Sequence, residues 1–406
     1  MKHIYFLILI FFIIPFFTFS QTWMQKTSIF NYGRYSAIGC ALNGKGYAGM
    51  GQNEDGTYMD DFWEYDPVKN NWKRKADFPG IGRYGASAYS IKGKIYVSFG
   101  YDNLRVSRND IWEYNPENDT WTEKAVFPGP ARYSASGFVL GDSVLYIGTG
   151  TYGNSSDYFY DFWMYSPAKN SWTRKSDFPG YNRQDAVSFS INGIGYLGSG
   201  LSHLMTPTRD FWKYNPVTDT WSAIQPLPND NATLVSFSIG GKGYVGGGTG
   251  SFPYSYTNNF LEYNPDTDTW TPAEPLNSAI PRYAGIGFSI GDVGYFGTGI
   301  NEGNFFSDFW AFDSKGTEDD ECECETDFDL YLYPNPATYK VILEIKKGYE
   351  FKNVMVYIYN SLGQFTIFHT TQSNKTEINI NRLEPGLYLA KIFVDSNVVV
   401  KRFIKM

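Results

Sequence analysis

The sequence predicts an all-β protein: a six-bladed β-propeller followed by a small β-sandwich domain. Two observations predict the propeller. One pattern of short apolar stretches and glycine turns occurs six times, and its copies follow one another in steps of 49 or 51 residues. Each copy also contains enough strand-length segments for one four-stranded sheet. Repeats of this length pack as sheets around a common axis, because a single sheet cannot bury both of its faces.

Most copies begin with Arg-Tyr and an apolar strand, continue with a second strand that ends in glycine, and then read Asp-Phe-Trp-x-Tyr-x-Pro before a second tryptophan. Short runs of this kind, bounded by turn residues, are typical of antiparallel strands. The second strands and their glycines span residues 44–51, 93–100, 141–150, 193–200, 241–248 and 291–299. The first tryptophan is Trp63, Trp112, Trp163, Trp212 or Trp310, with Leu261 in the fifth copy, and the second is Trp23, Trp72, Trp121, Trp172, Trp221 or Trp270.

The two ends of the repeat region complete each other. Trp310 begins a copy that has no second tryptophan, whereas Trp23 is a second tryptophan with no copy before it. We therefore expect the N-terminal strand around Trp23 to close the sixth blade. Such closure removes the two unpaired sheet edges that an open ring would expose.

With these motifs, residues 22–314 resemble the kelch family of β-propellers. The glycine-ended second strands match the Gly-Gly strand of that family, and Gly246–Gly248 keeps the double glycine best. Segments such as Tyr65–Trp72 and Tyr114–Trp121 match its third and fourth strands. The resemblance implies a fold like that of the central domain of galactose oxidase, and it leaves the ligand open, because one fold serves many functions.

Arginine opens the first strand of five copies, and aspartate opens the third strand of the same five. These strands run in the same direction, so both residues lie at one end of the blade. We expect buried, charge-assisted pairs: Arg34–Asp61, Arg83–Asp110, Arg132–Asp161, Arg183–Asp210 and Arg282–Asp308. In the fifth copy arginine, aspartate and tryptophan are replaced together by Asn231, Asn259 and Leu261, as expected for one structural cluster. The alternative is a ring of arginines that binds an anion.

The loops between the second and third strands open at the same end and vary in sequence while the strands repeat. Variable loops on a constant frame are where binding specificity usually lies. Exposed aromatic rings beside hydrogen-bonding groups suit the faces and hydroxyls of sugars. The candidate ligand-binding residues are Tyr58, Tyr101, Arg105, Tyr152, Tyr158, Tyr160, His203, Tyr254, Tyr256 and Phe305. The alternative is that these rings pack the loops onto the propeller.

The sequence gives little support for catalysis. The kelch resemblance extends to copper-radical sugar oxidases, but His3, His203 and His369 lie in separate regions and cannot supply their ligands. No His or Cys cluster has zinc or copper spacing, and no Gly-x-Ser-x-Gly motif occurs. We expect no catalytic residue, no metal and no cofactor. Paired carboxylates for glycoside hydrolysis, or the few polar groups that a kelch sialic-acid mutarotase needs, stay open as the alternative.

The first 20 residues have the features of a secretory signal peptide. Lys2 and His3 precede an apolar run, Ile4–Phe17, and small residues follow before Gln21. No later stretch is long and apolar enough for a transmembrane helix, so we expect a soluble mature chain. The net charge of −8 and the lack of a basic patch argue against nucleic acid as a partner.

A linker and a second domain follow the propeller, which we assign to residues 21–314. Residues 315–329 contain eight acidic residues and no apolar pattern, which predicts an extended or disordered linker. Its Cys322 and Cys324 are expected to be solvated, with a local disulfide or a weak metal contact as alternatives. Cys40 is expected to be a small core residue.

Residues 330–406 alternate between apolar and polar positions over short segments, which predicts a β-sandwich. They resemble the C-terminal sorting domain of type IX secretion in Gram-negative bacteria. The matching motifs are Tyr333-Pro334-Asn335-Pro336, Val356–Gln364, Leu383–Tyr388 and Lys401–Lys405. The resemblance implies handling by the type IX machinery, and a secreted or cell-surface location. We therefore expect an exported, non-catalytic recognition module for a glycan or a surface protein; a sugar-active enzyme is the alternative.

Overall fold

The structure is a computed structural model that describes residues 21–29, 32–153, 157–250, 255–276, 278–314, 330–346, 353–360, 365–394 and 397–406. Its regular elements within these ranges are all β-strands. No described segment forms a helix long and apolar enough to cross a membrane. The chain divides into two compact units, Met1–Gly316 and Thr317–Met406. The expected signal peptide and the acidic linker, with Cys322 and Cys324, lie outside the described residues.

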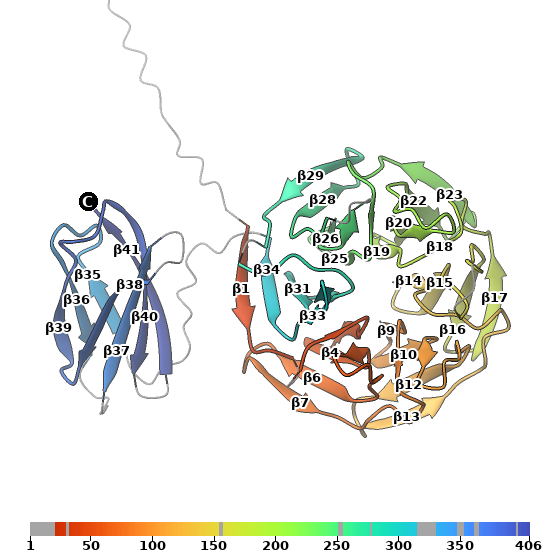
Figure 1. Ribbon diagram of the computed structural model, residues 1–406, viewed down its shortest axis with the longest axis horizontal. Coiled ribbons are helices and arrows are strands. Elements are labelled where there is room, and N and C mark those ends of the chain that lie inside the picture. The colour runs from red at the N-terminus through yellow and green to blue at the C-terminus, as the bar shows by residue number, and fades with distance from the viewer. Residues whose placement is uncertain are drawn as a thin grey trace, which may run out of the picture. The chain divides into compact units, whose positions relative to one another are not determined.

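Six four-stranded antiparallel sheets form the ring of the first unit (Figure 1). The innermost strands are β3 (Ile38–Leu42), β9 (Ser87–Ile91), β14 (Ser136–Leu140), β19 (Val187–Ile191), β25 (Val235–Ile239) and β30 (Ile286–Ile290). The second strands are β4 (Lys45–Gly49), β10 (Lys94–Ser98), β15 (Val144–Gly148), β20 (Ile194–Gly198), β26 (Lys242–Gly246) and β31 (Val293–Gly297). Neighbouring blades cover both faces of these second strands, and for this reason their residues are almost all buried.

The third strands carry the first tryptophan of each copy or its replacement, and the outer strands carry the second. The third strands are β6 (Phe62–Asp66), β12 (Ile111–Asn115), β16 (Phe162–Ser166), β22 (Phe211–Asn215), β28 (Phe260–Asn264) and β34 (Phe309–Asp313). The outer strands are β7 (Asn71–Arg74), β13 (Thr120–Glu123), β17 (Ser171–Lys175), β23 (Thr220–Ile224), β29 (Thr269–Ala273) and β1 (Thr22–Lys26). Strand β1 pairs with β34 over five residues, with Trp23 opposite Phe312, so the N-terminal strand completes the sixth blade.

Short strand pairs lie beside the inner strands. In four blades they join the chain before the first strand to the chain after the second, and in the sixth blade they lie within the loop between the second and third strands. They are β2 (Arg34–Tyr35) with β5 (Gln52–Asn53), β8 (Arg83–Tyr84) with β11 (Tyr101–Asp102), β18 (Arg183–Gln184) with β21 (Leu201–Ser202), β24 (Asn231–Ala232) with β27 (Thr249–Gly250), and β32 (Ile300–Asn301) with β33 (Asn304–Phe305). They mark the end of the ring that carries the loops between second and third strands, which we call the loop face.

A closed circle of six backbone hydrogen bonds joins each blade to the next at the loop face. In each, the glycine that follows the second strand donates to the carbonyl of the first residue of the next copy. The pairs are Gly51–Arg83, Gly100–Arg132, Gly150–Arg183, Gly200–Asn231, Gly248–Arg282 and Gly299–Arg34, at 2.7 to 3.2 Å. These glycines have φ between +87° and +109°. The repeated glycine is therefore required by the backbone at each junction.

The outer tryptophans fasten each blade to the preceding one. Trp72 contacts Tyr65 of its own blade and Phe309 of the sixth, with ring centroids 4.9 and 5.2 Å apart. Its indole nitrogen also donates to the carbonyl of Thr27 at 3.0 Å. Trp23 repeats this arrangement at the seam: it contacts Phe312 and Phe260 and donates to Glu274. The seam is thus held by the same contacts as the other junctions.

The second unit contains two antiparallel sheets around one apolar core. Strands β35 (Leu330–Tyr333), β36 (Lys340–Ile345) and β39 (Lys375–Asn379) form one sheet. The other has the order β38 (Phe365–Thr371), β37 (Val354–Asn360), β40 (Gly386–Val394) and β41 (Asn397–Lys405). Val341, Val356, Ile378 and Ile392 belong to the shared core. The predicted β-sandwich is therefore present.

Candidate functional site

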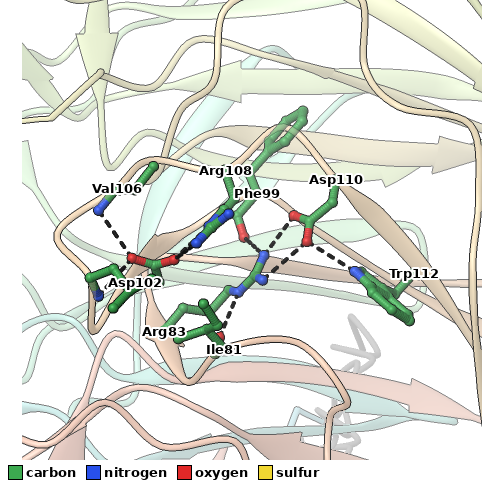
Figure 2. A network of polar contacts seen from close by, with 9 residues as sticks. Ile81, Arg83, Phe99, Asp102, Val106, Arg108, Asp110 and Trp112 are labelled. Carbon is green, nitrogen blue, oxygen red and sulfur yellow. Dashed lines mark hydrogen bonds and ion pairs between the residues drawn. The ribbon is translucent and has the colours of Figure 1, made fainter.

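Each of the five repeated arginines is buried in a hydrogen-bonded cluster of its own blade. Nη1 and Nη2 donate to the two oxygens of one aspartate; the Nη2–Oδ2 distances are 2.7 to 3.0 Å. Nη1 also donates to a carbonyl at the end of the second strand, such as Phe99 O for Arg83 at 2.9 Å. Figure 2 shows this cluster around Arg83, with the indole of Trp112 donating to the same Asp110 carboxylate.

These clusters leave the arginines unable to bind an anionic ligand. Arg34, Arg83, Arg132, Arg183 and Arg282 are at most 2 % exposed. Burial disfavours the charged carboxylates of Asp161 and Asp210, but the hydrogen bonds and charges of Arg132 and Arg183 outweigh it, so the pKa of both carboxyls is lowered. The alternative of an anion-binding arginine ring therefore has no support in the geometry.

The residues that lie two positions after the five arginines, and after Asn231 in the fifth copy, form an inner ring around the propeller axis. They are Ser36, Gly85, Ser134, Asp185, Thr233 and Ala284, and all have φ between +48° and +64°. Backbone hydrogen bonds link them across five of the six junctions, for example Gly85 N to Ser36 O at 3.0 Å and Ser134 N to Gly85 O at 2.7 Å. With their neighbours they line a cavity of about 170 Å³.

Tyrosines precede the inner-ring residues in most copies of the repeat. Tyr35, Tyr84, Tyr133 and Tyr283 occupy four blades, and Gln184 and Ala232 occupy the other two. The rings of Tyr35 and Tyr84 lie 6.1 Å apart, and those of Tyr84 and Tyr133 lie 5.5 Å apart. We call the inner ring and these preceding residues together the axial mouth.

Asp185 is the one acidic residue among those that line the axial cavity. Gln184 Nε2 donates to its carboxylate at 2.8 Å. Desolvation by the surrounding protein raises the pKa of Asp185, and hydrogen bonds from Ser134 and Gln184 partly oppose this rise. No lining residue is cationic, so the carboxyl has hydrogen-bond donors around it and no salt-bridge partner in the cavity.

Phenol groups from three blades lie within electrostatic reach of Asp185. Burial, together with neighbouring tyrosines and Asp185, raises the pKa of Tyr35 and Tyr133 to about 12. Burial and Asp185 also raise the pKa of Tyr158 and, with Tyr256, that of Tyr283. These hydroxyls keep their protons at physiological pH. Those of Tyr35, Tyr133 and Tyr158 donate them to Gln52 Oε1, Gly153 O and Met205 Sδ, so their oxygens stay available as acceptors. The axial mouth therefore combines neutral polar groups with neighbouring aromatic rings.

The structure brings part of the predicted ligand-binding set to this mouth. Tyr58 packs on Tyr84 at 5.0 Å, Phe305 on Tyr35 at 5.7 Å, and Tyr256 stacks on Tyr283 at 5.5 Å. Tyr158 donates to the sulfur of Met205 at 3.0 Å. These rings are half-buried and support the axial tyrosines.

Tyr101 is a correction to the sequence-based expectation. Its side chain is only 5 % exposed, because the rings of Tyr58, Tyr84 and Tyr133 enclose it. It therefore packs the loop onto the propeller, as the alternative expectation for the loop aromatics described.

Other members of the predicted set lie on the exposed parts of the loops. Tyr152 and Tyr160 are 46 % and 47 % exposed, and Arg105 and His203 are also exposed. The ring of His203 lies 5.9 Å from that of Tyr181. Tyr254 lies outside the described residues. The neighbouring Arg108 is engaged by buried Asp102 (Figure 2).

The sequence interpretation missed the axial tyrosines, Gln184 and Asp185. The repeated Arg-Tyr dipeptide marks the start of most copies and does not by itself indicate a binding site. The signal that marks the site is a departure from this dipeptide: the fourth copy reads Arg-Gln-Asp, where four of the other five copies read Arg-Tyr followed by a small residue. Within the described ranges, no group of three or more His, Cys, Asp or Glu residues is placed to hold a metal ion. Cys40 is a buried free cysteine, as expected.

Comparisons with known proteins agree with both halves of this architecture. The KLHDC2/KLHL20/DRC7 Kelch-repeats domain matches residues 16–195, and the Secretion system C-terminal sorting domain matches residues 331–406. Among solved structures, one titled "Structure of YjhT" has a TM-score of 0.63 and 16 % identity, and covers 73 % of this chain and 98 % of that chain. At this identity the likeness shows the fold alone. None of the curated proteins compared matches the chain.

Proposed function

We propose, for a chain that joins a kelch-repeat β-propeller to a type IX secretion sorting domain, that the exported propeller is a recognition module which binds an uncharged glycan at the axial mouth. The sorting domain directs the chain to the cell surface or the medium. Ligand recognition in that location is the role that the axial mouth supports best.

One observation carries this proposal: Asp185, which accepts a hydrogen bond from Gln184, lines a cavity on the propeller axis, and the phenols of neighbouring tyrosines lie within its electrostatic reach. Sugar hydroxyls need both donors and acceptors, and the amide, the carboxyl and the tyrosine hydroxyls supply both. The apolar face of a sugar ring packs well on aromatic side chains. The neighbouring rings of Tyr35, Tyr84 and Tyr133 offer such a surface beside the cavity.

The charges of the site favour a neutral ligand over an acidic one. The repeated arginines are engaged by aspartates, and the residues that line the axial cavity include no lysine, arginine or histidine. An acidic sugar would place its carboxylate close to Asp185. A sialic-acid ligand is therefore disfavoured.

A sugar-active enzyme is the second candidate, and the raised pKa of Asp185 is the observation that favours it. A carboxyl with a raised pKa is suited to general acid–base work. Glycoside hydrolysis uses two carboxyl groups on opposite sides of the bond, whereas Asp185 is the only acidic residue lining the cavity. The reaction left open is proton transfer that opens a sugar ring at its anomeric centre.

An array of neutral and acidic glycans, followed by calorimetry, tests the proposal. We expect saturable binding of a neutral glycan to the purified protein, loss of binding in Gln184→Ala, and unchanged binding in Tyr160→Ala as the loop control. Failure of every neutral glycan to bind would contradict the proposal. NMR of anomer interconversion separates the two candidates: turnover that Asp185→Asn abolishes while binding persists would identify an enzyme.

A further inference from the structure

The fifth blade contains a pocket where the other five blades contain a filled polar cluster. Its volume is about 470 Å³, within the usual range for small-molecule sites. Asn231, Asn259 and Leu261 all line it. These are the three residues that replace the arginine, the aspartate and the tryptophan of the other blades.

Loss of side-chain volume, with the backbone frame kept, creates this pocket. Gly247 N donates to Asn259 O at 3.2 Å, as Met50 N donates to Asp61 O at 3.1 Å in the first blade. Leu261 lies opposite Val245 in the same register that places Trp63 opposite Ala48. The strands therefore occupy equivalent positions in the two blades.

Two more positions add to the missing volume. Leu227 lines the pocket where the second, third and fourth blades place Phe78, Phe127 and Phe178 against the arginine. Gly247 stands where Met50 or Phe99 precedes the final glycine of the second strand, and a Cβ added to it would meet no atom closer than 3.4 Å. Several coordinated small replacements thus open one continuous space.

The lining of the pocket is chemically suited to a neutral, hydroxyl-bearing ring. Leu234, Val245 and Leu261 provide an apolar surface, and Asn231, Thr257 and Asn259 provide amide and hydroxyl groups. The side-chain amide of Asn259 is exposed and has no hydrogen-bond partner among the described residues. The lining residues include no cationic side chain. Asp230 is the acidic residue of the lining, and its exposed carboxylate lies 3.8 Å from the guanidinium of Arg209.

Leu234 lines both the pocket and the axial cavity, so the two are neighbours in the propeller. Among the described residues, the inner ring has no backbone hydrogen bond between Asp185 and Thr233, at the entry to this blade, although its five other junctions have one.

We infer that the fifth blade provides a second subsite, which binds a neutral sugar unit of an oligosaccharide whose first unit occupies the axial mouth. This inference rests on the proposed function and extends it from one sugar to a chain of sugars. The missing cluster is then the specificity determinant of the propeller, and the five intact clusters are its scaffold.

Refilling the pocket tests the inference. The variant Asn231→Arg/Asn259→Asp/Leu261→Trp restores the residues of the other blades, and Leu261→Trp alone fills part of the space should the triple variant fail to fold. Methyl glycosides of neutral hexoses and the corresponding trisaccharides serve as probes in calorimetry on the full chain. We expect trisaccharide affinity to fall about tenfold, the effect of losing one modest set of contacts, while methyl glycoside affinity stays unchanged.

Gln184→Ala at the axial mouth is the companion variant. If refilling leaves trisaccharide affinity unchanged while Gln184→Ala abolishes it, the subsite inference is overturned and the axial site stands. If refilling abolishes binding while Gln184→Ala has no effect, the axial proposal fails and the fifth blade is itself the primary site. If the wild-type protein binds neither probe, both are overturned.

Discussion

Arg132 donates two hydrogen bonds to Asp161, from Nη1 to Oδ1 at 2.7 Å and from Nη2 to Oδ2 at 2.9 Å, and Trp163 donates a third to Oδ2 at 2.7 Å. The guanidinium is fully buried and also lies 4.8 Å from the ring of Phe127. The guanidinium and the carboxylate satisfy each other's hydrogen bonds and charge, so loss of either one leaves the other as a buried charge without a partner. This explains why the fifth copy has replaced all three polar and aromatic members together.

The Arg132 cluster predicts a specific pattern of stability changes. Arg132→Ala should lower the free energy of unfolding by about 3–5 kcal/mol, because Asp161 keeps a buried charge without its partner. The double variant Arg132→Asn/Asp161→Asn should recover part of that loss, since it imitates the fifth blade. Chemical denaturation measures both. Arg74→Ala is the control: its pair with Asp77 is exposed, and the expected change is below about 1 kcal/mol. Equal losses in the single and double variants would argue against a coupled pair.

The fold could be predicted from the sequence because its determinants are local and repeated. Glycines such as Gly51 and outer tryptophans such as Trp72 recur at fixed steps, and each makes the same contact at every junction. The role of Trp23 was predictable for the same reason. It is an outer-strand tryptophan with no other strands of a blade before it in the chain, so it must complete the blade that lacks one. Because the same contact recurs at every junction, the repeat itself indicates which residues of neighbouring blades meet, which a single sequence without repeats does not show.

The candidate site was less predictable because it depends on positions where the repeat is broken. Tyr101 belongs to a variable loop, yet three other rings bury it. Asp185 lies two positions after Arg183 in the fourth copy, and it comes close to Tyr35 and Tyr283 of other copies only because the ring of blades closes. Contacts across the axis join residues of different copies, and no spacing within one copy encodes them.

The raised pKa of Asp185 predicts a pH-dependent effect of Asp185→Asn. The native state holds the proton of this carboxyl more tightly than the unfolded chain does, whose aspartates titrate near about 3.9. Its contribution to stability is therefore complete below that value and decreases as the pH rises through the native pKa. A neutral amide at this position avoids this loss, so the variant should have a higher Tm than the wild type at pH 7, with a smaller difference at pH 4. A Tm difference that does not change with pH would show that Asp185 is not desolvated as described.

The seam predicts a distinct outcome for Trp23→Ala. Truncation of a large aromatic side chain in a packed site costs about 3–5 kcal/mol, and the half-burial of Trp23 points to the lower end. Trp221→Ala removes the same contacts at an internal junction and is the matched control. Both variants should lose similar stability in thermal unfolding. Only Trp23→Ala should expose an outer strand to proteolysis, because β1 is held to its blade by non-covalent contacts alone, whereas the other outer strands are connected to their third strand by a short turn. Equal protease sensitivity of the two variants would argue against a seam at this position.

The sorting domain predicts the fate of a chain that ends at Ser314. The propeller forms its own compact unit with a closed ring of blades, and the core of the sorting domain is built from its own residues. Deletion of residues 315–406 should therefore leave a propeller whose midpoint of thermal unfolding lies close to that of the same unit in the full chain. Export across the outer membrane should fail, because the type IX signal is removed. Cell fractionation should then find the truncated chain in the periplasm. Deletion of residues 315–329 alone is the control. This variant keeps the sorting domain, so the type IX machinery should still deliver it to the cell surface or the medium. Surface delivery of the truncated propeller would show that the export signal lies elsewhere in the chain.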